Sequence, residues 1–232
     1  MKPNQLILLH GGYSLKEQLE QVKEKIKNKF VIGMNYSFED FDSTLLTYVD
    51  YDFYKQNIEK LKELPLIIGN YNESIIKMKT LNTIMLSKAQ IYKRDLSNGV
   101  YRSNLAGLFA LSLGIYLLDE GEIFLLGADF GSIFPKKDIK NRFLTHYYQD
   151  KIHHRGIGKI SYYTSYNARR DYKVYVDENK IKIYNVGLLS NIPTFEKIDY
   201  PTFFNMLDDN TYNQEELRTE IKNKIKGLPC IK

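Results

Sequence analysis

The chain has 232 residues, of which 43% are hydrophobic and 26% charged, and its formal net charge is +5. This composition is that of a globular protein and excludes a disordered or fibrous chain, while the mild positive charge suits a phosphate-bearing ligand without demanding nucleic acid. The single cysteine, Cys230, excludes an intramolecular disulfide framework and a cysteine-based structural zinc site, which favours a reducing, cytoplasmic location.

Hydrophobic patterning argues against a membrane span. No apolar run approaches the roughly 20 residues that a membrane helix needs, and the first residues are better interpreted as a strand than as a signal peptide. The amphipathic, lysine-rich segment 215–227 leaves peripheral membrane contact open, with a solvated terminal helix as the alternative. We expect one domain over residues 1–232 that folds alone or as a simple homo-oligomer.

Short apolar runs alternate with segments of helical spacing along the first 130 residues. The apolar runs cover 5–10, 30–35, 44–49, 65–70 and 122–129, and the helical segments cover 14–29, 51–64 and 99–121. Alternation of this kind is typical of a parallel sheet covered on both faces. The pattern predicts an α/β, Rossmann-like, doubly wound fold.

The alternation breaks after Phe130. Residues 131–170 are rich in Tyr, His, Lys and Arg, which predicts a lid-like insertion over the site. The segment 172–187 alternates with period two on both sides of "DENK", which indicates a hairpin or at least a strand at 180–185. The residues from 200 to 232 are expected to form C-terminal helices.

A doubly wound sheet binds its ligands at the carboxyl ends of the strands, so the residues after each run are the first candidates. In "LILLHGGYSLKEQL", Ser14 and Glu17 form the S-x-x-E pattern of a helix capping box, which needs no ligand. Gly11 and Gly12 before it could instead expose backbone amides to a phosphate. If they do, Gly12→Val should abolish nucleotide binding and leave the fold largely intact.

A second glycine-marked turn is "RDLSNGVYRSNLAG". Asn98 and Gly99 could cap a helix or approach a ligand, and Arg94 could pair with a phosphate or carboxylate. Two carboxylates, Asp50 and Asp129, follow predicted strands. They could hold Mg²⁺ against a diphosphate, or accept hydrogen bonds from sugar hydroxyls or the backbone.

The segment "THYYQDKIHHRGIGKISYYTSYNARR" gathers most of the histidines. His146, His153 and His154 could supply a base that titrates near neutral pH. Their spacing matches no common zinc motif, so no metal site is assigned to them. The alternative is a surface segment that packs its tyrosines on the sheet.

The order of these motifs resembles one group of enzymes. Six motifs carry the resemblance, and in chain order they are a glycine turn with serine after the first strand, "GMNYSFED", "SNGVY", "IFLLGADF", "HYY" and "IKIYNVGLLSNI". Through them the chain resembles the bacterial sialyltransferases of the Campylobacter type, glycosyltransferase family 42. The DUF115 proteins, which include the archaeal 6-hydroxymethylpterin diphosphokinases, are similar more distantly. The resemblance spans residues 6–192.

This resemblance implies roles for individual residues. Gly11, Gly12 and Ser14 would lie along the nucleotide phosphate and ribose, and Asn35 would contact the nucleotide. The remaining implied positions are Asp50 facing the donor, Asn98 and Gly99 at the substrate, and Tyr147 near the leaving phosphate. The family uses a histidine base and no essential metal. Gln149 and Asp150 stand where that histidine is expected, so the base is His146, His153 or His154, or it is absent.

The sequence therefore predicts a nucleotide-dependent transferase, of sialyltransferase-like glycosyltransferase type, that takes a nucleotide-activated sugar and requires no cofactor. One alternative is a diphosphokinase of the DUF115 pterin type, in which Asp50 and Asp129 hold Mg²⁺. Another is a non-catalytic nucleotide-binding module. Nucleic acid is not an expected partner.

Overall fold

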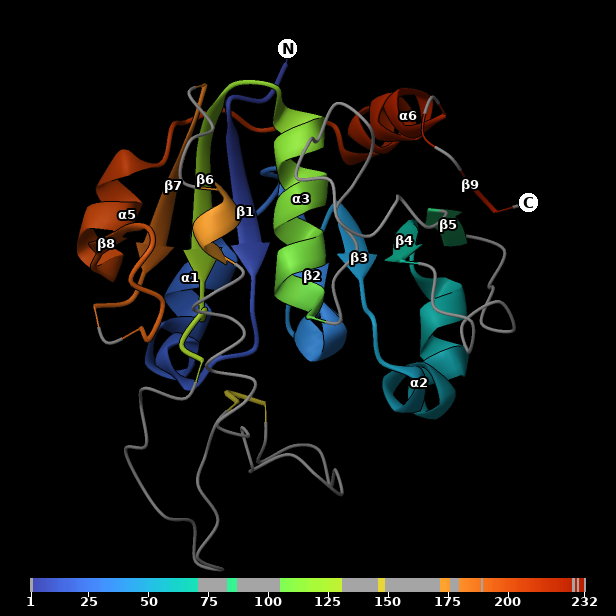
Figure 1. The fold of residues 1–232 in the computed structure, drawn as a ribbon, viewed down its shortest axis with the longest axis horizontal. Coiled ribbons are helices and arrows are strands. Elements are labelled where there is room, and N and C mark those ends of the chain that lie inside the picture. Colours follow the sequence, from blue (N-terminus) through green and yellow to red (C-terminus); the bar gives the residue numbers. More distant parts are fainter. Residues whose placement is uncertain are drawn as a thin grey trace, which may run out of the picture.

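The computed structural model describes residues 2–70, 83–86, 105–130, 146–148, 172–175, 180–188, 190–226, 228 and 230–231. These residues form a sheet of nine strands in the order β8-β7-β6-β1-β2-β3-β4-β5-β9 (Figure 1). The strands are β1 (Gln5–Leu9), β2 (Val31–Met34), β3 (Leu45–Thr47), β4 (Ile67–Asn70), β5 (Thr83–Leu86), β6 (Gly121–Leu126), β7 (Ile181–Val186), β8 (Glu196–Ile198) and β9 (Cys230–Ile231). All neighbouring strands from β1 to β8 pair in parallel, and β9 pairs antiparallel with β5.

Helices cover both faces of this sheet, as the alternation of the sequence predicts. On one face α1 (Leu19–Lys25), α2 (Tyr51–Glu63) and α5 (Tyr200–Met206) bury apolar side chains in one core cluster. On the other face α3 (Ala106–Leu118) and α6 (Gln214–Ile225) contribute to a second cluster. The fold is therefore the expected Rossmann-like, doubly wound α/β fold.

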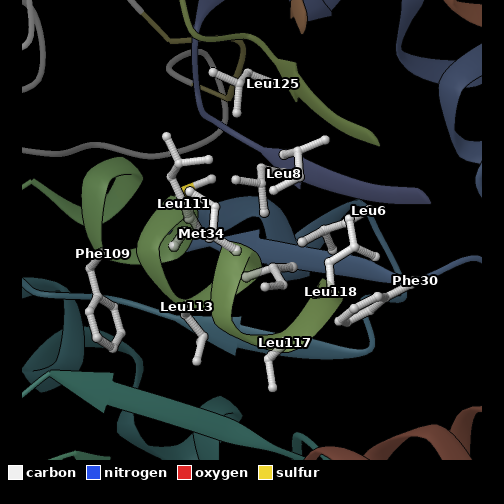
Figure 2. Packing of buried hydrophobic residues seen from close by; sticks show 14 of the residues in the cluster. Leu6, Leu8, Phe30, Met34, Phe109, Leu111, Leu113, Leu117, Leu118 and Leu125 are labelled. Carbon is white, nitrogen blue, oxygen red and sulfur yellow. The ribbon is translucent and has the colours of Figure 1, made fainter. Parts of the chain in front are cut away.

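The long apolar helix α3 lies at the centre of the second face. Figure 2 shows its leucines beside Leu6 and Leu8 of β1 and Phe30. Gly114 lets α3 approach the sheet closely, because a Cβ atom there would lie only 2.6 Å from the Leu6 side chain. Burial on nearly all sides explains the hydrophobicity of α3. Within the described part of the chain, no helix has the length and apolarity to cross a bilayer.

Three features differ from the predicted elements. The first predicted helix, 14–29, begins as a 3₁₀ helix at Tyr13–Gln18 before α1. The predicted strand at 180–185 is confirmed as β7, but the hairpin is wrong, because Tyr172–Tyr175 forms a 3₁₀ helix and β7 pairs in parallel with both of its neighbours. The strands β5, β8 and β9 were not predicted. Apart from 146–148, the insertion at 131–170 lies outside the described residues.

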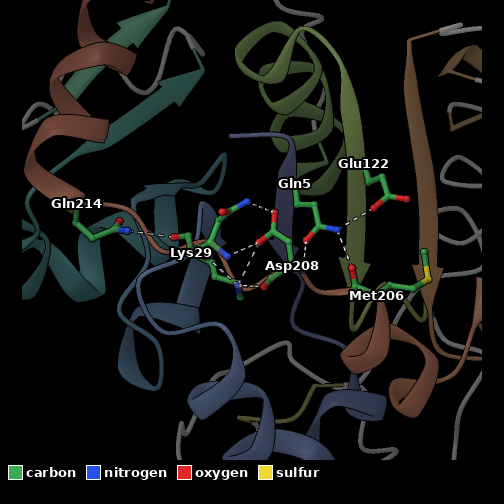
Figure 3. Close-up of polar contacts among 7 residues, drawn as sticks. Gln5, Lys29, Glu122, Met206, Asp208 and Gln214 are labelled. Carbon is green, nitrogen blue, oxygen red and sulfur yellow. Dashed lines mark hydrogen bonds and ion pairs between the residues drawn. The ribbon is translucent and has the colours of Figure 1, made fainter. Parts of the chain in front are cut away.

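The C-terminal helices are fixed to the amino edge of the sheet by partly buried polar contacts (Figure 3). Lys29 Nζ donates to the backbone oxygens of Asp208 and Asn210, at 2.6 and 3.0 Å. Gln5 Nε2 donates to the Met206 carbonyl and to Glu122, both at 2.8 Å. The contacts hold α5 and α6 against their respective faces.

The apolar side of α6 is part of the core. Leu217, Ile221 and Ile225 of this helix are all buried in the cluster around α3. The amphipathic pattern that left membrane contact open is thus accounted for by packing within the chain, and lysines such as Lys222 lie on the outer side.

Candidate functional site

The strand order reverses between β1 and β6. From β1 the sheet continues through β2, β3, β4 and β5 in one direction, and through β6, β7 and β8 in the other. The chain leaves β1 towards α1 on one face and enters β6 from α3 on the opposite face. Such a reversal is where doubly wound sheets bind their ligands, at the carboxyl ends of the two strands. The segments after β1 and β6 are therefore the candidate site.

The glycine turn after β1 packs against the protein's own backbone. Gly12 N donates to the Gly127 carbonyl oxygen at 2.9 Å, and Tyr147 N donates to Gly11 O at 3.0 Å. A Cβ atom on Gly12 would collide with the Gly127 oxygen and would lie 2.6 Å from Asp129 Oδ2. Gly12 is thus required by the fold. The expectation that Gly12→Val would leave the fold intact is wrong.

Ser14 does not form the predicted capping box. Its backbone amide donates to Asp129 Oδ2 at 2.7 Å, and its hydroxyl donates to Asp129 Oδ1 at 2.5 Å. The carboxylate of Asp129, rather than that of Glu17, therefore receives the amide at the start of the 3₁₀ helix. Burial raises the pKa of Asp129, although the two hydrogen bonds from Ser14 oppose this shift.

Asp50 and Asp129 do not form one metal site. Asp50 is exposed and caps α2 by accepting a hydrogen bond from the Asp52 amide at 2.9 Å. It follows β3, whereas Asp129 follows β6, and both β1 and β2 lie between those strands. Three strand spacings amount to about 14 Å, too far for two carboxylates to share one ion. Nowhere in the described residues do three or more His, Cys, Asp or Glu gather as a possible metal site.

Asn35 lies at the carboxyl end of β2, near the candidate site. Its backbone has a φ of 49°, a left-handed conformation that asparagine tolerates better than most residues. The side-chain oxygen of Asn35 is buried and has no hydrogen-bond partner. The backbone conformation explains why an asparagine stands here, and the unpaired oxygen is compatible with the predicted ligand contact.

His146 reaches the glycine turn, whereas Tyr147 lies in the core. His146 forms a bridge with Gly12, is partly exposed, and packs its ring at 5.2 Å from that of Tyr148. Tyr147 is 3% exposed and packs edge-on against Phe41. Burial raises the pKa of the Tyr147 hydroxyl. The other predicted site residues, which are Arg94, Asn98, Gly99, His153 and His154, lie outside the described residues.

One residue of this edge was a candidate by its position after the first strand, but no role was predicted for it. His10 directly follows β1, is 6% exposed, and its Nε2 has no hydrogen-bond partner. Burial lowers the pKa of His10 to about 3, so its imidazole is neutral at physiological pH. Its ring lies 6.0 Å from that of Phe130, edge to face. A polar residue at the end of a buried apolar run was the available signal in the sequence.

His10 packs against the first turn of α3. A Cβ atom on Gly107 would collide with His10 Cε1 and would lie 2.9 Å from Nδ1. Cε1 joins the two ring nitrogens, so the polar edge of the imidazole faces this turn. The start of α3 has no acidic residue and no side-chain cap, whereas α2, α5 and α6 are capped by Asp50, Asp199 and Asn213.

Comparison with protein families, with curated proteins and with solved structures finds no match.

Proposed function

We propose that the protein is a nucleotide-dependent group transferase, of sialyltransferase-like glycosyltransferase type, that uses a nucleotide-activated sugar. The observation that carries this proposal is the meeting of three motifs that are far apart in the sequence. The glycine turn, "GADF" and "HYY" come together where Gly12 contacts Gly127 and His146. They are three of the six motifs on which the resemblance depends, and they meet at the edge where such sheets bind ligands.

His146 is the proposed general base. It is the described histidine that is both partly exposed and adjacent to the glycine turn. In the proposed reaction, its imidazole removes the proton of an acceptor hydroxyl while that oxygen bonds to the sugar carbon. The bond from this carbon to the phosphate oxygen breaks, and the nucleotide leaves with the electron pair.

Two measurements test the proposal. Thermal shift with cytidine, uridine, guanosine and adenosine phosphates should identify a nucleotide that stabilises the full chain. Release of that nucleotide from its sugar conjugate should then fall by about 10²- to 10⁴-fold in His146→Ala, with nucleotide affinity retained. Absence of a thermal shift with all four classes would contradict the proposal.

One observation favours a second candidate, a non-catalytic nucleotide-binding module. The resemblance implies a tyrosine at the leaving phosphate, yet Tyr147 is buried beside Phe41. Under this alternative, nucleotides bind to the wild-type chain, but no conjugate is turned over. His146→Ala would then leave nucleotide affinity unchanged and have no activity to reduce.

A further inference from the structure

Two helix starts lie at the carboxyl edge beside β1, and one of them already holds an anion. At the 3₁₀ helix after Gly12, the Asp129 carboxylate accepts hydrogen bonds from the Ser14 amide and hydroxyl. A phosphate at the same amide would have to displace this carboxylate or lie against it, and like charges at that distance repel. The glycine turn is therefore a poor site for the phosphate of a nucleotide.

The space beside Gly11 is also taken by the protein. A Cβ atom on Gly11 would lie 2.7 Å from the Tyr148 hydroxyl and 2.9 Å from the His146 ring. The two aromatic side chains pack against this face of the turn. Gly11 and Gly12 allow the chain to pack on itself.

The start of α3 is the second position. The first amides of a helix have no partners within the helix, and the helix dipole makes this end favourable for an anion. The amides of Leu108 and Phe109 donate to the Leu105 oxygen, so Ala106 and Gly107 carry the amides at the very start of the helix. Because α3 leads directly into β6, its first turn lies at the carboxyl edge of the sheet, beside the end of β1 (Figure 1).

His10 adds a buried polar group that points to a ligand at this position. Its Nε2 is unpaired, and the edge of the ring with both nitrogens faces Gly107. Unpaired polar atoms are rare in protein interiors, because each loses its hydrogen bonds to water without replacing them. A bound group that accepts a hydrogen bond from the neutral imidazole would remove this cost.

We propose that His10 and the first turn of α3 bind the phosphate of the ligand. This inference rests on the proposed function for the identity of the ligand, and it moves the phosphate from the glycine turn to the opposite face of β1. The α3 amides and one imidazole N–H donate to the phosphate oxygens. Gly107 is required because any side chain there would displace His10.

Histidine NMR on the full chain tests this assignment with inorganic pyrophosphate as the probe. The chain has four histidines, so ¹⁵N-labelled histidine gives a simple spectrum, and His10→Gln identifies the His10 signals. The His10 nitrogens should shift and saturate as pyrophosphate is added, with smaller changes at His146. A shift at His146 without one at His10, or no shift at millimolar pyrophosphate, would overturn the proposal.

Variants give an independent measure by calorimetry. His10→Leu should weaken pyrophosphate binding by about 10- to 100-fold, and His10→Gln, which keeps a donor, should weaken it less. Circular dichroism verifies that both variants are folded. Asp129→Asn serves as the control, because a phosphate at the glycine turn would bind more tightly once the carboxylate charge is gone. A tighter Asp129→Asn complex, or an unchanged His10→Leu complex, would contradict the proposal.

The same data separate this inference from the proposed function. Pyrophosphate that shifts the His10 signals while no nucleotide binds would support the anion site and reject the nucleotide. A nucleotide that binds His10→Leu as tightly as the wild type would retain the proposed function and reject the anion site.

Discussion

The Asp129 carboxylate accepts hydrogen bonds from both the backbone amide and the hydroxyl of Ser14, across 115 positions of the sequence. Asp129 is 4% exposed, so water cannot easily replace a lost partner. We predict that Ser14→Ala lowers the free energy of unfolding by about 1–3 kcal/mol, measured by urea denaturation.

Ser37→Ala is the matched control for this prediction. Ser37 is also buried, but its hydroxyl has no hydrogen-bond partner. Its removal should change the free energy of unfolding little or even increase it, because no bond is lost. Equal losses in the two variants would show that the contact of Ser14 with Asp129 does not stabilise the fold.

Gly12 should tolerate substitution much less well than Gly11. A Cβ atom on Gly12 collides with the backbone oxygen of Gly127, whereas one on Gly11 meets the ends of the Tyr148 and His146 side chains, which can move. We predict that Gly12→Ala lowers the free energy of unfolding by about 3 kcal/mol and Gly11→Ala by clearly less. Urea denaturation of both variants measures these losses of unfolding free energy. Similar losses in the two would refute the steric explanation.

The fold could be predicted from the sequence because its strands are buried on both faces. Such strands give continuous apolar runs, which the runs ending at His10, Asn35 and Asp129 display. The strands β5 and β9 were missed at the end of the sheet, where β9 has only two residues. The alternation with period two near Tyr172 does not correspond to a hairpin, because β7 pairs in parallel with both β6 and β8.

The candidate site was less predictable because distant residues decide it. Ser14 and Glu17 have the spacing of a capping box, but Asp129 takes the amide that Glu17 would have accepted. No local pattern reports a partner from another strand. Likewise, only the packing of α3 on β1 reveals that the His10 ring faces Gly107.

His10 should make the stability of the protein depend on pH. Its pKa is about 3 in the folded chain and 6.5 when exposed, so the unfolded chain binds the proton first as pH falls. The contribution of His10 to the free energy of unfolding is fully present above pH 6.5 and is lost as the pH falls towards 3. Between pH 7 and pH 5, the wild type should lose about 2 kcal/mol more than His10→Gln. Parallel pH profiles of the two unfolding free energies would contradict a buried neutral imidazole.

Lys29 should contribute far more to stability than an exposed lysine in an ion pair. Its side chain is 10% exposed and bonds to the backbone oxygens of Asp208 and Asn210, which anchors the C-terminal segment. Lys29→Met should cost about 3 kcal/mol. Lys60, which pairs with Glu39 at the surface, is the control, and Lys60→Met should cost less than about 1 kcal/mol. Equal unfolding free energies for the two variants would show that the anchor contributes nothing.

The contact between Gly107 and His10 can be measured by a double-mutant cycle. Alanine is a better helix former than glycine by about 1 kcal/mol, so Gly107→Ala would stabilise α3 if space allowed. Because the new Cβ atom would collide with the His10 ring, we predict a net loss of about 1–3 kcal/mol in the wild type. In His10→Ala the ring is gone, and the same change should be neutral or stabilising.

The four unfolding free energies of this cycle should then differ from additivity by about 2 kcal/mol. An equal cost in both backgrounds would identify the Tyr172 hydroxyl, 2.6 Å from the same Cβ position, as the real obstruction.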